Sequence, residues 1–227
     1  MIGIINAMEI ENNSVLSLCT DIKEKTISGK KFYEATLAGE RVVCCLSGVA
    51  KVNAAISTTL LLEHFPVDYI LNTGAAGGLK DNENVLDCVI STQVVEHDFD
   101  TSPLDGKEGL GLFYNADPKL VNLAKEVVEE MKVPYHTGLI ATGDQFITSE
   151  SCKRILELFP ESMCAEMEAG SIAHVASHYG VPFVIIRSLS DIAVKEGNNM
   201  AFNEYVEKAA KRSAEFCEKC VIKLSKK

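Results

Sequence analysis

Long apolar runs and positive charge are both scarce in this 227-residue sequence. Nowhere do 18 apolar residues follow one another, and no basic leader precedes the short apolar run at residues 1–5, so neither a membrane span nor a signal peptide is expected. The 22 lysines and arginines are outnumbered by 32 aspartates and glutamates, giving a net charge of −10. This balance argues against a nucleic-acid or anionic-membrane partner and leaves a neutral or zwitterionic small molecule.

The sequence also lacks a linker rich in proline, glycine or serine, and it has no visible internal repeat. Its 47% of hydrophobic and 24% of charged residues are ordinary for a globular protein that buries a substantial core. We therefore expect one domain over residues 1–227.

Eight cysteines are present, but they are scattered through apolar runs and do not resemble a disulfide framework. A reduced cytoplasmic protein with buried thiols is expected. The one C-x-x-C, Cys217 to Cys220, has neither a second pair nor a histidine at zinc-site spacing. Core packing is favoured for it, because it shares one face of a predicted helix with Val206, Ala209, Ala210, Val221 and Leu224.

Short β-rich runs alternate with longer amphipathic runs, which predicts an α/β fold: three α/β/α layers around a central mixed, mostly parallel, twisted sheet. Strands are predicted at residues 1–5, 32–37, 41–47, 69–73, 88–95, 138–142, 163–167 and 183–189. Helices are predicted at residues 10–19, 52–65, 118–131, 150–159, 169–179 and 202–223.

Two connections can be anticipated. Gly39 with Glu40 is typical of a two-residue hairpin turn between the second and third strands. Residues 98–115 form the longest irregular stretch, and such stretches in compact domains tend to be lids or binding loops.

The segment CAEMEAGSIAHVA, residues 164–176, places Glu166 and Glu168 between an apolar strand and a helix. An unpaired buried charge costs several kcal/mol, so these carboxylates are expected to be paired, protonated or functional. The alternative for either one is to cap the helix, where negative charge is favoured.

Ligands of open parallel sheets bind beyond the carboxyl ends of the strands, so the residues after each apolar run are the first candidates. They include Glu11, Glu168, Asp191, Phe146 and the glycine-rich turn TGAAGGL at residues 73–79. Such a set suits a purine nucleoside. An aromatic ring offers a face to the base, glycines let the backbone approach, and a carboxylate accepts ribose hydroxyls. Cleavage of the glycosidic bond needs an acid and a base.

Taken singly, these signals have simpler explanations. The TGAAGG turn matches neither a phosphate-binding loop nor a dinucleotide fingerprint. Phe146 can belong to the core, and Asp191 can cap a helix. His97 with Asp98 suggests a metal or a catalytic dyad, but no second histidine lies at ligand spacing, which favours a loop role. Their co-occurrence in one order favours the nucleoside site.

Six blocks spanning Met1 to about Ala193 closely resemble the bacterial methylthioadenosine/S-adenosylhomocysteine nucleosidases, a family with the fold of the purine nucleoside and uridine phosphorylases. The blocks are MIGIINAMEIE, SGVAKVNAA, LNTGAAGGL, GLIATGDQFI, AEMEAGSIAHVA and VPFVIIRSLSDIA. The resemblance implies a hydrolase that releases adenine from adenosyl thioether nucleosides, in methionine salvage, without a metal or organic cofactor. It also implies a homodimer in which a loop of the neighbouring subunit helps to close the pocket, and residues 98–115 are where we expect that loop.

By the same resemblance, Asp191 is the acid that protonates N7 of adenine, Ser190 orients it, and Glu11 activates the attacking water. A free aspartate has a pKa near 3.9, so this acid needs burial or a hydrogen bond that favours its protonated form. Glu168 is expected to accept the ribose hydroxyls. The resemblance further implies that Phe146 and the Ile147 backbone contact adenine, and that Met167, Ala76 and Gly77 lie along the base and ribose. Arg187 is expected to hold the catalytic network. The sugar and alkylthio pockets are expected to be lined by Met8, Val49 and Phe202.

The chain departs from the family pattern without losing a catalytic group: Asn6 and Ala50 stand where glycines are common. Two other functions are considered. A phosphorylase needs arginines at the site, and the four in this chain, at 41, 154, 187 and 212, do not lie beside the first-strand turn or TGAAGG. A non-catalytic nucleoside sensor needs neither Glu11 nor Asp191.

Overall fold

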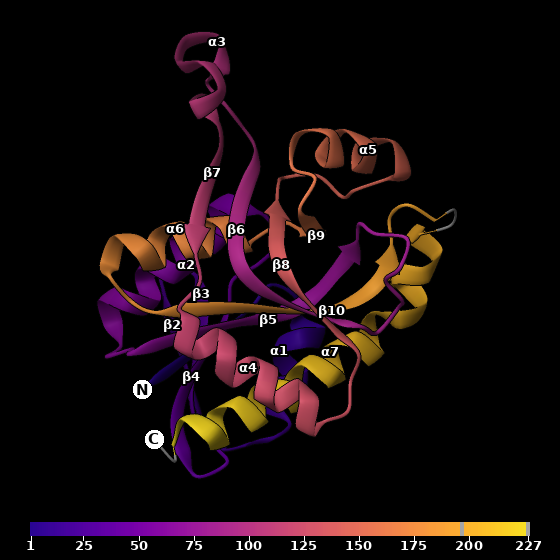
Figure 1. The fold of residues 1–227 in the computed structure, drawn as a ribbon. Coiled ribbons are helices and arrows are strands. Elements are labelled where there is room, and N and C mark those ends of the chain that lie inside the picture. The colour runs from indigo at the N-terminus through magenta and orange to yellow at the C-terminus, as the bar shows by residue number, and fades with distance from the viewer. Residues whose placement is uncertain (196–197, 226–227) are drawn as a thin grey trace.

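A continuous sheet of ten strands carries the fold, with helices on both of its sides (Figure 1). The computed structural model describes residues 1–195 and 198–225 of the chain. The α/β class and the mixed sheet are as expected from the sequence. The strand pairings between described residues divide into parallel ones and antiparallel ones.

One half of the sheet is built around β1 (Ile2–Asn6), whose five residues are all buried. It pairs in parallel with β4 (Glu40–Leu46) on one side and with β5 (Tyr69–Gly78) on the other. Beyond β4 the antiparallel strands β3 (Lys30–Leu37) and β2 (Cys19–Ile27) extend the sheet to its edge.

The other half closes into a ring. From β5, the pairing continues through β10 (Phe183–Ile192), β6 (Cys88–Asp100), β8 (Tyr135–Thr142) and β9 (Ser162–Glu166), and β9 pairs with β5 again. Every residue of β10 is buried. The ring brings the carboxyl ends of β5, β8, β9 and β10 around one space, which is where the sequence predicts the site.

Helices cover both faces. The long α7 (Asn198–Leu224) packs on β5 and β10 beside α1 (Glu9–Leu16) and α4 (Pro118–Glu130), while α2 (Lys51–His64) packs against α6 (Ala169–Tyr179) (Figure 1). A further helix, α5 (Ser149–Leu158), lies beside β8 and β9. None of the helices described is both long and apolar enough to cross a membrane.

The cysteines are buried or half-buried free thiols. Cys217 and Cys220 are fully buried in α7 with their neighbours, so the prediction that the C-x-x-C packs in the core is confirmed. No group of side chains suited to a metal ion occurs among the described residues.

Four sequence predictions were wrong in detail. One is the glycine-rich turn at residues 73–79, because residues up to Gly78 continue strand β5. The first helix ends at Leu16, and Cys19 already begins β2, a strand missed because its charged, exposed residues show no apolar alternation. The hairpin turn consists of Ala38 and Gly39, both with positive φ (51° and 86°), and Glu40 is the first residue of β4. Such angles suit a two-residue turn that follows the strand twist.

A further correction concerns residues 98–115, which form regular secondary structure and not an irregular loop. β6 continues to Asp100, a helical tip follows in α3 (Ser102–Asp105) and η1 (Gly106–Gly109), and β7 (Leu110–Asn115) returns along β6. This arm projects from the body of the protein (Figure 1). Its tip exposes 88% of Leu104.

Candidate active site

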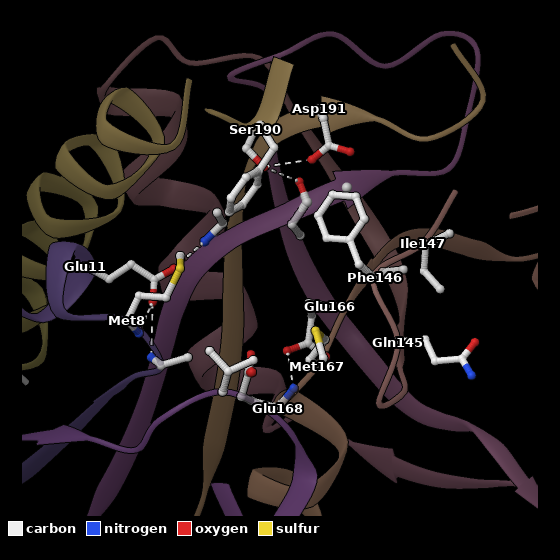
Figure 2. Close-up of a pocket in the computed structure, with 17 residues that line it drawn as sticks. Met8, Glu11, Gln145, Phe146, Ile147, Glu166, Met167, Glu168, Ser190 and Asp191 are labelled. Atoms are coloured by element: carbon white, nitrogen blue, oxygen red, sulfur yellow. Dashed lines mark hydrogen bonds between the residues drawn. The ribbon is translucent and has the colours of Figure 1, made fainter. Parts of the chain in front are cut away.

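A cavity of about 210 Å³ opens at the carboxyl ends of the ring strands. Twelve of the thirteen site residues predicted from the sequence line it: Met8, Glu11, Val49, Ala76, Gly77, Phe146, Ile147, Met167, Glu168, Ser190, Asp191 and Phe202. The thirteenth, Arg187, lies beneath the cavity with 1% of its surface exposed. Figure 2 shows Glu11 and Asp191 on different sides of this space, with Glu168 and Met167 below and Phe146 on a third side.

Glu11 lies in the first turn of α1, and three main-chain amides outside that helix fix its carboxylate. Its Oε2 accepts hydrogen bonds from the amides of Ala7 (3.1 Å) and Met8 (3.0 Å), and its Oε1 accepts one from Ala75 (2.9 Å). Burial raises the pKa of this carboxyl, while Arg187 and the three amides oppose part of the rise. A carboxylate with an elevated pKa that is held in one orientation is suited to accept a proton from water.

Gly74 makes this arrangement possible. A Cβ atom at that position would lie 2.4 Å from Nη1 of Arg187 and 2.6 Å from Oε1 of Glu11. Only the absence of a side chain lets the strand approach both charged groups so closely.

Arg187 supports the site from within the protein. Its Nη2 donates to Oδ1 of Asn72 (2.7 Å) and to Oε2 of Glu166 (2.5 Å). The same Oε2 accepts the amides of Glu168 (3.0 Å) and Ala169 (2.8 Å) at the start of α6. Glu166 therefore holds the helix terminus and the buried arginine, which is the structural alternative that the sequence left open for it.

Glu168 is free of that capping role and faces the cavity. Its Oε1 accepts the amide of Ala50 at 2.8 Å. Burial and the neighbouring Glu166 raise the pKa of Glu168 to about 7, against the lowering effect of Arg187 and of the Ala50 amide. Near neutral pH this side chain can thus be ionised and accept hydrogen bonds from hydroxyl groups.

A β-bulge presents Asp191. The register of β10 on β5 shifts between Leu189 and Asp191, so that Ser190 is the extra residue. Asp191 is 2% exposed, and its Oδ1 accepts a hydrogen bond from the Ser190 hydroxyl at 2.9 Å. Gly77 provides room for it, since a Cβ there would lie 3.1 Å from Oδ2 of Asp191. The bulge turns a buried carboxyl group toward the cavity instead of capping a helix.

The aromatic side of the cavity comes from two distant segments. Phe146 is 46% exposed and meets Phe202 of α7 edge to face, with ring centroids 5.7 Å apart and planes at 82°. Phe146 is therefore not a core residue, and its face is available to a flat ligand. Ile147, which follows it, is buried.

His97 and Asp98 belong to the end of β6 and not to a dyad. Asp98 pairs with Lys51 (2.6 Å) and accepts the Asp144 amide (3.1 Å). Burial alone would raise the pKa of Asp98, but these hydrogen bonds lower it. Asp98 thus has a structural role, but both residues belong to strand β6 and not to the loop that the sequence favoured.

Five lining residues were not among the predicted site residues: Ala7, Ala75, Gln145, Ala165 and Glu166. Each directly precedes a predicted site residue or lies within two positions of one. Extending each predicted segment by a residue or two would have found them.

Four buried carboxyl groups, those of Glu11, Glu166, Glu168 and Asp191, line one cavity with an aromatic wall, as in an enzyme that acts on small molecules. The phosphorylase superfamily model matches residues 1–223. A curated 5′-methylthioadenosine/S-adenosylhomocysteine nucleosidase from Staphylococcus carnosus is 44% identical over 220 residues, covering 95% of this chain and 96% of its own. The chain belongs to the phosphorylase superfamily and, within it, to the family of these nucleosidases.

Solved structures agree with this assignment. The nucleosidase of Neisseria meningitidis in complex with methylthio-immucillin-A superposes with a TM-score of 0.92 at 34% identity, covering 97% of both chains. A futalosine hydrolase mutant of Helicobacter pylori superposes with a TM-score of 0.91 at 32% identity, covering 98% of both chains.

Proposed function

We propose that this protein hydrolyses the N-glycosidic bond of 5′-methylthioadenosine and S-adenosylhomocysteine, releasing adenine and the thioribose product. The observation that carries the proposal is the pair Glu11 and Asp191, two buried carboxylates on different sides of one cavity. The names of the relatives supply the substrate class.

In the proposed reaction, Asp191 protonates N7 of adenine, and Ser190 keeps its carboxyl group in place. The departing base leaves an oxocarbenium-like sugar, which water attacks. Glu11 takes the proton of that water. An acid, a base and water suffice, so the proposed reaction requires no metal and no organic cofactor.

The other side chains of the cavity are assigned by their chemistry. Phe146 stacks on adenine and the Ile147 backbone binds its edge, while Ala76 and Gly77 lie along the base and ribose. Glu168 accepts the ribose hydroxyls, and Met167 packs beside the ribose. The alkylthio group is assigned to the apolar part of the wall, formed by Met8, Val49 and Phe202.

Water is favoured over phosphate as the nucleophile. No arginine or lysine is found among the described residues that line the cavity. The guanidinium of Arg187 is buried and bound to Glu166 and Asn72. A phosphate dianion entering beside Glu11 would meet negative charge without a cationic partner of its own.

The test is adenine release from methylthioadenosine, with and without added phosphate. We expect release at the same rate in both conditions, with free thioribose as the second product. Phosphate-dependent release of a ribosyl phosphate would show a phosphorylase, and tight binding without release would show a sensor. A parallel assay with futalosine measures selectivity, because a futalosine hydrolase shares the fold.

Replacing Glu168 by glutamine is expected to raise KM for methylthioadenosine by about 10- to 100-fold, because hydrogen bonds to a charged acceptor are lost. Because burial raises the pKa of Glu168 to about 7, wild-type kcat/KM should fall as the pH drops through that value. The variant should lose this part of the pH profile. Glu161→Gln, an exposed change of the same kind, is the control. An unchanged KM in Glu168→Gln would contradict the role.

We further propose that the protein forms a homodimer through the face made by α2, α6 and β7. Val52 and Ile56, one turn apart on α2, expose 69% and 45% of their surfaces. Tyr114 of β7 stacks on His174 of α6, so these elements form one surface. It adjoins Val49 at the cavity and continues into the arm, whose exposed Leu104 is proposed to help close the partner's pocket.

Val52→Glu is expected to shift the protein from dimer to monomer, because it places a charge in the apolar centre of this face. Leu158→Glu, at a 43% exposed leucine on α5, serves as the matched control and should stay dimeric. Sedimentation velocity measures both. A Val52→Glu protein that remains a dimer would remove this face as the interface.

We also propose that residues 1–227 act as one domain, because the sheet joins segments from both ends of the chain. A cytoplasmic location is proposed from its eight free cysteines, seven of them buried. The acidic net charge supports a small-molecule partner over nucleic acid or a membrane.

A further inference from the structure

The turn at residues 47–51, between β4 and α2, has an unusual backbone. Ala50 adopts φ +80° and ψ 162°, a region that is essentially restricted to glycine. It stands at the N-cap of α2, and its own methyl side chain cannot cap the helix. Its amide is the group that donates to Oε1 of Glu168. An alanine keeps such a conformation only where its surroundings impose it.

Two carboxylates accept the consecutive amides that flank the Cα atom of Ala50. Glu168 accepts the Ala50 amide at 2.8 Å, and Oδ1 of Asp144 accepts the next amide, that of Lys51, at 2.9 Å. The Lys51 side chain donates to Asp98 at 2.6 Å, and Asp98 also accepts the Asp144 amide at 3.1 Å. The turn is thus linked to Asp144 in two ways. The Lys51 amide bonds the Asp144 side chain directly, and the Lys51 side chain reaches the Asp144 amide through Asp98.

Asp144 also belongs to the segment that carries the aromatic wall. It stands two positions before Phe146, and Gln145 between them lines the cavity. The preceding Gly143 donates its amide to the main chain of Glu166 at 3.1 Å. The hydrogen bond from Lys51 to Asp144 therefore connects the segment facing the base with the turn that orients Glu168.

We infer that Asp144 is a positioning residue: by holding the Lys51 amide, it keeps Ala50 in its strained conformation and thereby keeps the Ala50 amide on Glu168, the acceptor for the ribose. This inference rests on the proposed nucleosidase function. Without Asp144, Ala50 relaxes to an ordinary conformation and its amide turns away. Glu168 then faces Glu166, Glu11 and Arg187 without that donor.

The simpler alternative is that Asp144 only caps α2 from outside the helix. A cap of this kind would contribute to stability alone. Loss of such a cap would leave the substrate affinity and the pH profile unchanged. Its effect on stability would also be the same with alanine or glycine at position 50. These three readouts separate the two roles.

The first experiment measures methylthioadenosine kinetics of Asp144→Ala and Asp144→Asn. Asp144→Ala is expected to raise KM about tenfold with a smaller change in kcat, and to move the acidic limb of kcat/KM to higher pH. Asp144→Asn keeps an oxygen that can accept the Lys51 amide, and it should recover most of the loss. An unchanged KM and pH profile in Asp144→Ala would overturn the inference.

The second experiment adds Ala50→Gly to form a double-mutant cycle. Glycine adopts the observed angles without strain, so the Ala50→Gly/Asp144→Ala protein should regain much of the affinity that Asp144→Ala loses. A KM as high in the double variant as in Asp144→Ala would overturn the strain mechanism.

Thermal unfolding of the same four proteins needs no substrate. Ala50→Gly should raise Tm by about 3 °C when Asp144 is present and by clearly less when it is absent. Additive shifts would contradict the coupling. If the wild type released no adenine, the proposed function would fail, while this cycle would still report on the strained turn.

Discussion

Asp191→Asn is expected to lower kcat for methylthioadenosine by about 10³-fold or more while the nucleoside still binds. General acid catalysis contributes on the order of 10² to 10⁴ in rate, and the asparagine amide is not acidic enough to transfer a proton to N7 of the leaving base. Asparagine has nearly the size of aspartate and keeps an oxygen that can accept the hydrogen bond from the Ser190 hydroxyl, which is 2.9 Å long in the wild type. The cavity should therefore retain its shape.

Single-turnover adenine release measures the chemical step, and calorimetric titration measures affinity. Asp81→Asn makes the same chemical change on an exposed loop residue and should behave as wild type. Full activity in Asp191→Asn would exclude this residue as the acid. Loss of binding together with activity would point to a role in shaping the cavity.

Glu11→Gln is the second large effect, and it should be accompanied by a loss of stability. Removing the base is expected to lower kcat by about 10³-fold with little change in affinity. The carboxylate also accepts three main-chain amides, on both of its oxygens. An amide side chain must direct its NH₂ group at one or more of these donors, which leaves a buried donor unsatisfied at about 1–3 kcal/mol.

The measurements are hydrolysis rate, affinity for methylthioadenosine and Tm. Glu9→Gln, at an exposed position two residues earlier, is the matched control. A variant with an unchanged kcat would refute the role as base. A variant that binds as tightly as wild type but melts earlier and does not hydrolyse is the expected outcome.

The candidate site could be predicted largely because it lies where strands end. Apolar runs mark β1, β5, β8, β9 and β10, and the polar or aromatic residues that follow them meet around one cavity. The helix predicted at residues 118–131 is present as α4, and the side chain of Asp117 caps it by accepting the amides of Lys119 and Leu120. Local patterns therefore gave most elements of the fold and most residues of the site.

What depends on distant contacts could not be predicted in this way. The charged strand β2 exists because β3 offers it a backbone partner, and β7 exists because the extended β6 does. The burial of Arg187 and its pairing with Glu166 depend on how β9 and β10 face each other within the ring. The angles of Ala50 depend on hydrogen bonds to two residues that are each more than 90 positions away in the chain.

The two glycines of β5 that make room for charged groups also tie two distant carboxylates to one strand. Gly74 lies against the carboxylate of Glu11 and Gly77 against that of Asp191. A side chain added at Gly74 would collide with Glu11, and one added at Gly77 would press on Asp191. The absence of two side chains from a single strand therefore sets the positions of carboxylates that stand 180 residues apart in the sequence.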